Sequence, residues 1–233
     1  MQNERPPRTL ILYSDYCCPF SYIAKVTVER YINTAIFPPK IKYRLFDLRE
    51  PLRLPNGDLD WSRNQSRDDY AKRVQVAVDV LSEQRDVFIK NSTPLDVNSW
   101  SAQKAAYYIK ENYPNIIFQM FHREIFRKLW REDKDIGKRT ELKSVASKVG
   151  IQTDEIDQIL DDDKFEKEFA AYLRRVKQSI PRATPTLVYQ EQTISGAISL
   201  GDVRRLVRFA KGHPADEMGL DLIPHYMLPQ HQE

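Results

Sequence analysis

The chain has 233 residues, of which 41% are hydrophobic and 30% charged, a composition typical of one large folded domain or a domain that carries an insertion. Its 36 basic and 33 acidic side chains leave a net charge of +3, which argues against a nucleic-acid or anionic-membrane surface. No apolar run approaches the roughly 20 residues that span a bilayer, and the first ten residues hold no apolar signal segment, so we expect a cytoplasmic protein with reduced thiols.

The first predicted elements are a strand, a helix and a second strand. Residues 9–14 (TLILYS) form a short apolar run rich in strand formers. Pro19 follows at the first turn of a predicted helix, where its missing N–H costs no hydrogen bond. Residues 41–45 then alternate between apolar and basic side chains, which predicts a second strand. This order predicts a parallel βαβ unit.

Residues from about 68 to about 176 show helical periodicity almost throughout. Apolar side chains recur three and four positions apart in successive segments of this stretch, which predicts a block of amphipathic helices. Asn98 is a predicted N-cap, and Gly150 is predicted to lie just beyond the end of a helix.

Strand character returns near the end of the chain. Residues 186–189 and 193–195 are short β-type runs separated by a polar turn, which predicts a hairpin, and an amphipathic helix that ends at Gly212 follows. The order of elements is therefore βαβ, a block of helices, then ββα. We predict an α/β domain in two halves with a helical domain inserted between them, at residues 1–62, 63–176 and 177–233.

Both cysteines of the chain are adjacent, at Cys17 and Cys18. Cys18 directly precedes the predicted helix, whose unpaired N–H groups and positive dipole end favour an anion, so we expect its thiol to ionise more readily than an ordinary cysteine and to act as a nucleophile. Ser21 lies one turn on and can donate its hydroxyl hydrogen to the sulfur. We expect Cys17 to be a small buried hydrophobe, because a disulfide between neighbours is strained. The alternative is that both cysteines are core residues.

The ordered combination of motifs resembles the DsbA family of thioredoxin-fold proteins over nearly the whole chain up to Gly212. The family's Asp-x-x-Cys-Pro-x-Cys-Tyr stretch corresponds to residues 15–22 (DYCCPFSY), and its cis-proline loop corresponds to residues 184–186 (TPT). Residues 46–57 (FDLREPLRLPNG) and 98–109 (NSWSAQKAAYYI) look like segments of the cytoplasmic FrnE-like branch. The resemblance implies a thioredoxin-like fold with a large inserted helical domain.

The resemblance also implies how a substrate would bind. Pro185 is expected in the cis form, which turns the backbone of Thr184 towards the sulfur so that it can pair with an extended peptide or with glutathione. Taken alone, this Thr-Pro-Thr run also fits a trans-proline at a strand entrance. Ser21 stands where the family has its second cysteine, so the expected chemistry is monothiol exchange through a mixed disulfide that an external thiol resolves.

Two other functions remain open. Glutathione-dependent isomerases of the 2-hydroxychromene-2-carboxylate type and kappa-class transferases share this architecture, and a hydroxyl at their helix start stabilises glutathione thiolate. The third hypothesis is a thioredoxin-like binding module without redox activity. We expect no tightly bound cofactor, with glutathione as a possible co-substrate and a protein disulfide or small thiol as the substrate. We expect no nucleic-acid or membrane partner. A homodimer is left open.

The remaining candidates carry weaker signals. Phe20 and Tyr22 either line the substrate cleft or pack the helix onto the sheet. The histidines have no metal-ligand spacing, so we expect no metal, and His122 is predicted on a solvated face; the other three are His213, His225 and His231. The basic side chains of the segment FHREIFRKLWR are most simply a charged helix surface, or else the rim of a pocket for an acidic substrate: Arg123, Arg127, Lys128 and Arg131.

Overall fold

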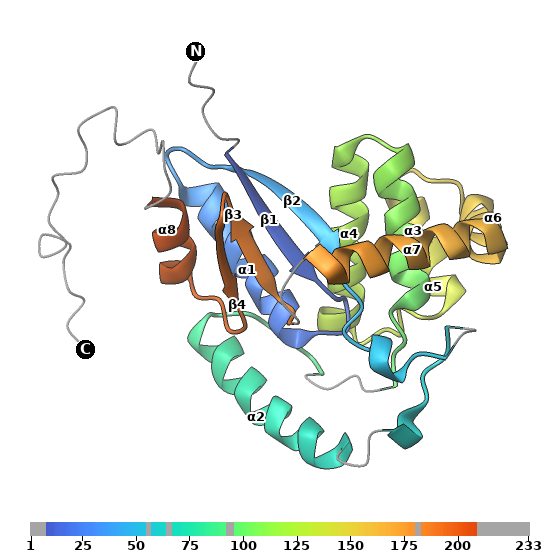
Figure 1. Ribbon diagram of the computed structural model, residues 1–233, viewed down its shortest axis with the longest axis horizontal. Coiled ribbons are helices and arrows are strands. Elements are labelled where there is room, and N and C mark those ends of the chain that lie inside the picture. The colour runs from blue at the N-terminus through green and yellow to red at the C-terminus, as the bar shows by residue number, and fades with distance from the viewer. Residues whose placement is uncertain (1–7, 55–56, 64–66, 92–95, 180–182, 209–233) are drawn as a thin grey trace, which may run out of the picture.

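A computed structural model describes residues 8–54, 57–63, 67–91, 96–179 and 183–208 of the chain. Four strands form one mixed sheet in the order β2-β1-β3-β4 (Figure 1). β1 is parallel to β2 and antiparallel to β3, and β3 is antiparallel to β4, which confirms the predicted βαβ unit and hairpin. The strands span Thr9–Ser14 (β1), Lys40–Leu45 (β2), Thr186–Tyr189 (β3) and Gln192–Ser195 (β4).

The register of the sheet brings three chain segments to one edge. The carboxyl ends of β1 and β2 lie together because Ser14 pairs with Leu45 in the parallel ladder. β3 runs the other way and begins at this edge, where Thr186 pairs with Tyr13. The turn after β1, the loop after β2 and the segment before β3 therefore meet there, although they are far apart in sequence.

Two helices complete the thioredoxin-like part. α1 (Pro19–Thr34) packs against β1, and α8 (Leu200–Arg208) packs against both α1 and β4. Leu10 and Leu12 of β1 are fully buried beneath this layer. Gly212, the predicted end of α8, lies outside the described residues.

A helical region lies between β2 and β3 in the chain, as predicted. Most of it gathers beside the carboxyl ends of β1 and β2, whereas α2 lies apart along the lower edge of the view and packs against α1 (Figure 1). The exact domain boundaries stay predictions. The helices are α2 (Arg67–Gln84), α3 (Trp100–Asn112), α4 (Asn115–Glu132), α5 (Arg139–Lys148), α6 (Thr153–Asp161) and α7 (Asp163–Ser179), with short 3-10 turns at Glu50–Leu52 and Trp61–Arg63.

Two of the helix ends predicted from the sequence are the start of α3 and the end of α5. Ser99 is the N-cap of α3, one residue later than predicted, but the Asn98 side chain still accepts a hydrogen bond from Trp100 N at 3.1 Å. Gly150 follows the C-cap of α5 with φ of +82°, a left-handed conformation that glycine adopts at little cost, as predicted.

The prediction for His122 is wrong. Its side chain is 1% exposed, and its ring lies among the rings of Tyr16, Tyr43, Phe118 and Phe126. Its Nδ1 is 2.8 Å from the Tyr16 hydroxyl. The prediction relied on the charged residues next to His122 in the sequence, but His122 lies on the buried face of α4. His213, His225 and His231 lie outside the described residues.

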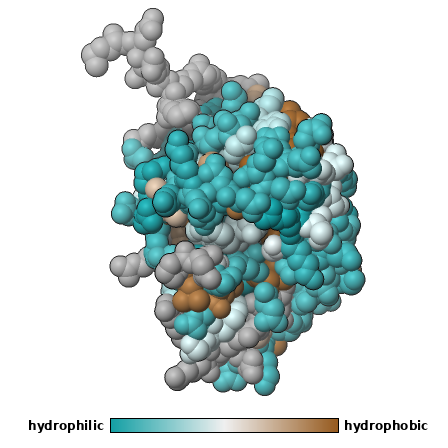
Figure 2. Space-filling view, turned by 90° about the vertical axis from the view of Figure 1, so that its right-hand side faces the viewer, coloured by the Kyte–Doolittle hydropathy of each residue, from teal (hydrophilic) through white to brown (hydrophobic). Residues whose placement is uncertain are grey.

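The outer face of the helical region is mainly hydrophilic (Figure 2). Ion pairs lie across it, including Arg139 with Asp161 at 2.6 Å and Lys128 with Glu141 at 2.9 Å, which agrees with the charged surface predicted for α4. None of the helices among the described residues combines the length and the apolar character that crossing a membrane requires. Within the same residues, no three His, Cys, Asp or Glu side chains gather closely enough to hold a metal ion.

Candidate active site

Cys17 and Cys18 lie in the turn that connects β1 to α1. Cys18 is the N-cap of α1, with φ of −95° and ψ of 113°, and Pro19 occupies the first helical position, as predicted. The Cys18 N–H donates to Asp15 O at 3.2 Å, and its carbonyl accepts the first hydrogen bonds of the helix, from the N–H groups of Ser21 and Tyr22. The turn therefore fixes the Cys18 side chain at the amino end of α1.

The segment before β3 faces this turn. The Thr184–Pro185 peptide bond is cis, as the motif predicted. The Cys18 thiol lies 3.6 Å from the Thr184 carbonyl oxygen and donates to it, across 166 positions of sequence. The hydroxyls of Ser21 and Thr184 lie 2.9 Å apart. Cys18, Ser21, Thr184 and Pro185 are thus brought together in one place, and Cys18, Ser21 and Thr184 are all buried.

Each hydroxyl carries one hydrogen, which decides whether Ser21 or Thr184 is the donor in their contact. The Thr184 hydroxyl has one hydrogen, and it donates to Tyr13 O at 3.3 Å. Ser21 is then the donor in its contact with Thr184, which uses the only hydroxyl hydrogen of Ser21. While Cys18 is a thiol, it donates to Thr184 O. When Cys18 becomes a thiolate, the Ser21 hydroxyl must turn from Thr184 to the sulfur to stabilise it.

The expectation that Cys18 ionises readily is not met in this closed conformation. The side chain is 2% exposed, and burial raises its pKa to about 11. In the thiolate form, hydrogen bonds from the Ser21 side chain and from the N–H groups of Ser21 and Phe20 lower the pKa, whereas the charge of Asp15 raises it further. Helix-terminal amides do favour the thiolate here, but the loss of water outweighs them.

The Cys17 side chain lies on a different side of the turn and is buried in the core, as predicted. It is 4% exposed, and its thiol donates to Val97 O at 3.3 Å, not to the Thr184 side of the turn. Burial raises its pKa to about 12. Both cysteines are reduced and unpaired.

Beneath the turn lies a buried carboxylate that sequence reasoning did not assign to the site. Asp15 is fully buried and accepts hydrogen bonds from Cys17 N at 2.8 Å, Leu48 N at 2.8 Å and the Ser99 hydroxyl at 2.9 Å. Burial and the neighbouring charge of Asp47 raise the pKa of Asp15. This network joins the cysteine turn to the loop after β2 and to the start of α3. The sequence signal that could have identified Asp15 is an acidic residue directly after a buried strand.

Phe20 and Tyr22, the two aromatic candidates, occupy different environments. Tyr22 is 6% exposed and stacks on Phe126 and Trp130 of α4, with ring centroids 5.9 and 6.2 Å apart. Phe20 is half-buried at the edge of the core. Of the two, only Phe20 has a surface that an incoming molecule could touch without moving the helix.

Several solved structures share this fold. A probable DsbA oxidoreductase from Streptomyces coelicolor is 16% identical, with a TM-score of 0.65 over 86% of this chain and 88% of that one. A 2-hydroxychromene-2-carboxylate isomerase is also 16% identical, with a TM-score of 0.65 over 93% of this chain and 100% of that one. The cytosolic disulfide reductase DsbM from Pseudomonas aeruginosa, solved with GSH, is 17% identical, with a TM-score of 0.50 over 92% and 100% of the two chains.

No curated protein matches the chain in sequence. The sequence model of the DSBA-like thioredoxin domain matches residues 9–208, which include every described strand and helix. The chain therefore belongs to the DSBA-like thioredoxin domain family.

Proposed function

We propose that this member of the family is a monothiol thiol–disulfide oxidoreductase with Cys18 as its nucleophile. The observation that carries the proposal is the position of the Cys18 sulfur, at the amino end of α1 and 3.6 Å from the carbonyl oxygen before cis-Pro185. Ser21, one helical turn away, cannot form the second half of a dithiol pair. Cys17 donates its thiol to Val97 O on another side of the turn and is not placed to replace it.

The reaction is a disulfide exchange in two steps. The Cys18 thiolate attacks one sulfur of a substrate disulfide, so that a Cys18–substrate S–S bond forms and the original S–S bond breaks. The leaving thiolate takes up the proton that Cys18 lost. A second, external thiolate then attacks the mixed disulfide and releases Cys18, which is unchanged overall. After these two steps the external thiol is joined to one substrate sulfur, and a further molecule of the external thiol must attack that disulfide to release the second substrate thiol. The substrate disulfide is then reduced to two thiols, and two molecules of the external thiol are oxidised to one disulfide.

The protein has three tasks in this reaction. Because Cys18 is 2% exposed, its sulfur must first be uncovered. The Ser21 hydroxyl then turns to the thiolate, and the Thr184 backbone pairs with the incoming chain beside the sulfur. We place Phe20 at the rim of this path and assign glutathione, present in the reducing cytoplasm, as the external thiol. A homodimer stays a prediction.

Glutathione-dependent reduction of hydroxyethyl disulfide tests the proposal. The unchanged protein and Cys17→Ser should both catalyse the reaction, and Cys18→Ser should not. Ser21→Cys should gain the ability to form an internal disulfide and to release a mixed disulfide without external thiol. Equal rates for the parent and Cys18→Ser would refute the proposal.

One observation favours a second candidate, a glutathione-binding isomerase or transferase. The Cys18 thiol is buried with a pKa of about 11, whereas a hydroxyl at the same helix start could stabilise the thiolate of a bound glutathione without a covalent bond. Calorimetric titration with reduced glutathione separates the two candidates. Binding that persists in Cys18→Ala and weakens in Ser21→Ala would favour the isomerase or transferase.

A further inference from the structure

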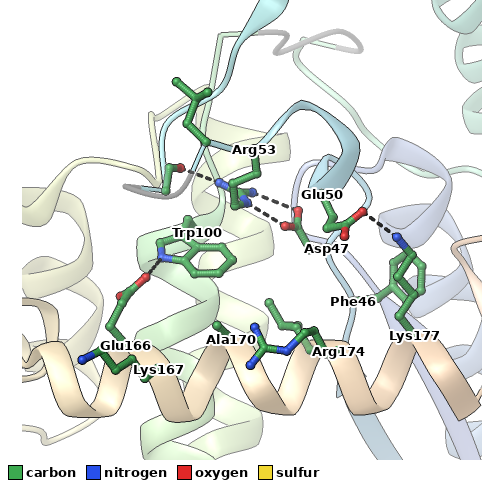
Figure 3. A pocket seen from close by; sticks show the side chains of 13 residues that line it. Phe46, Asp47, Glu50, Arg53, Trp100, Glu166, Lys167, Ala170, Arg174 and Lys177 are labelled. Carbon is green, nitrogen blue, oxygen red and sulfur yellow. Dashed lines mark hydrogen bonds and ion pairs between the residues drawn. The ribbon is translucent and has the colours of Figure 1, made fainter. Parts of the chain in front are cut away.

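A pocket of about 400 Å³ lies between α7, the start of α3 and the loop after β2 (Figure 3). Its volume falls within the range of sites that take small molecules. None of Cys18, Ser21, Thr184 and Pro185 lines it. The pocket is therefore a candidate site that shares no residue with those assigned to the thiol chemistry.

One wall of the pocket is held rigidly by Arg53. Its guanidinium bonds Asp47 at 2.6 and 2.9 Å and donates to Gly57 O at 2.6 Å. The same group lies over the Trp100 ring at 4.5 Å, and the indole N–H of Trp100 donates to Glu166 at 2.5 Å (Figure 3). Since each polar group of this wall is already bonded, the wall is in place before any ligand arrives.

The acids that line the pocket are all matched by cations. Asp47 pairs with Arg53. Glu50 pairs with Lys177 at 2.5 Å, and Glu166 pairs with Lys104 at 2.8 Å. This pairing leaves the pocket without unmatched negative charge from its own lining.

Two cations of the lining remain. Lys167 and Arg174 have no acidic partner among the residues that the structure describes. In Figure 3 the Arg174 guanidinium lies over Ala170, on the side of α7 that faces Trp100, whereas Lys167 extends from the far end of the pocket. Both side chains are exposed, so the positive charge of the pocket lies at its rim.

The remaining lining is apolar, with Phe46, Leu54, Ala170 and Leu173 around the aromatic ring of Trp100. We propose that this pocket binds a small molecule with a flat apolar body and a single carboxylate. A guanidinium matches a carboxylate with two parallel hydrogen bonds, so Arg174 receives the carboxylate. The apolar body packs between Ala170, Leu54 and Trp100.

Isothermal titration with 2-naphthoate tests this assignment, with the neutral 2-naphthamide as the matched ligand. We expect 2-naphthoate to bind the full chain roughly tenfold or more tightly than 2-naphthamide, as a hydrogen bond to a charged group allows. Arg174→Gln should remove that difference. Arg175→Gln makes the same charge change at the next position of α7, which is also exposed but does not line the pocket, and should retain it.

A second variant tests the place of binding. Ala170→Leu adds bulk to the half-buried lining of the pocket and should weaken both ligands, while Cys18→Ser should weaken neither. Equal affinity for the two ligands, equal losses in Arg174→Gln and Arg175→Gln, or competition by reduced glutathione would overturn the proposal. Because Cys18 is not part of this site, failure here leaves the thiol proposal standing, and the reverse also holds.

Discussion

Two substitutions should change the pKa of Cys18 in opposite directions, because they change the hydrogen bonds that its sulfur can accept. In a Cys17→Ser background, Cys18 is the only thiol. Ser21→Ala removes the side-chain hydrogen bond that lowers the Cys18 pKa. A hydrogen bond to a charged group contributes about 1.5–3 kcal/mol, which corresponds to about one to two pKa units. The thiolate fraction near pH 8 should therefore fall about tenfold to a hundredfold.

Thr184→Val should act in the other direction. In the native protein the Ser21 hydroxyl donates to Thr184 and must give up this neutral contact before it can stabilise the thiolate. Such a contact contributes about 1 kcal/mol, a factor of about five in an equilibrium constant. Valine removes the competing acceptor but keeps the backbone carbonyl that faces the sulfur. The thiolate fraction should therefore rise up to about fivefold.

The assay is the rate of iodoacetamide addition, followed by intact mass between pH 7 and pH 10. For the Cys17→Ser parent, the rate should still be rising at pH 10, because burial raises the Cys18 pKa to about 11. The same chain in denaturant provides the reference for an ordinary thiol. A parent profile that levels off below pH 8.5, or two variants that shift the rate in the same direction, would refute this account of the hydrogen bonds.

Three further predictions concern stability. Phe126→Ala should lower the free energy of unfolding by about 3–5 kcal/mol in urea, because Phe126 is fully buried and contacts Tyr16, Tyr22 and His122; a loss below about 1 kcal/mol would contradict the packing described. Arg53→Ala should cost about 3–5 kcal/mol, since it leaves Asp47 buried without its partner, whereas Lys177→Ala, which breaks an exposed pair, should cost less than about 1 kcal/mol. Burial, with the nearby charge of Lys25, keeps the pKa of His122 well below 6.5, so the unfolded chain takes up the proton first and stability should fall as pH drops below about 6.5, by up to about 1.4 kcal/mol per pH unit. His122→Phe should flatten this dependence between pH 5 and 7, and an unchanged slope would exclude His122 as its source.

Local signals account for what the sequence predicted well. Pro19 after Cys18, the β-type runs around residue 190 and the Gly150 turn each depend on conformations that a few neighbouring residues decide. The cis bond at Pro185 was predicted from a motif and its partner motif near Cys18 together, and the structure places both at one edge of the sheet.

What the sequence did not predict depends on contacts between distant segments. The Asp15 network needs Ser99, which is 84 positions away, and no local pattern relates the two. His122 sits among charged neighbours on α4, yet the packing of α4 on Tyr16 and Tyr43 buries it. The pKa of Cys18 was misjudged for the same reason: the helix end is visible in the sequence, whereas the depth at which the fold buries the sulfur is not.

The most direct test of the central claim is where oxidised glutathione attaches to the folded chain. Intact mass followed by peptide mapping should find one glutathionyl group on Cys18, present in Cys17→Ser, absent in Cys18→Ser and removed by reduced glutathione. An adduct confined to Cys17, or a folded protein that stays unmodified at pH 8 while its unfolded form reacts, would contradict the assignment of Cys18 as the nucleophile.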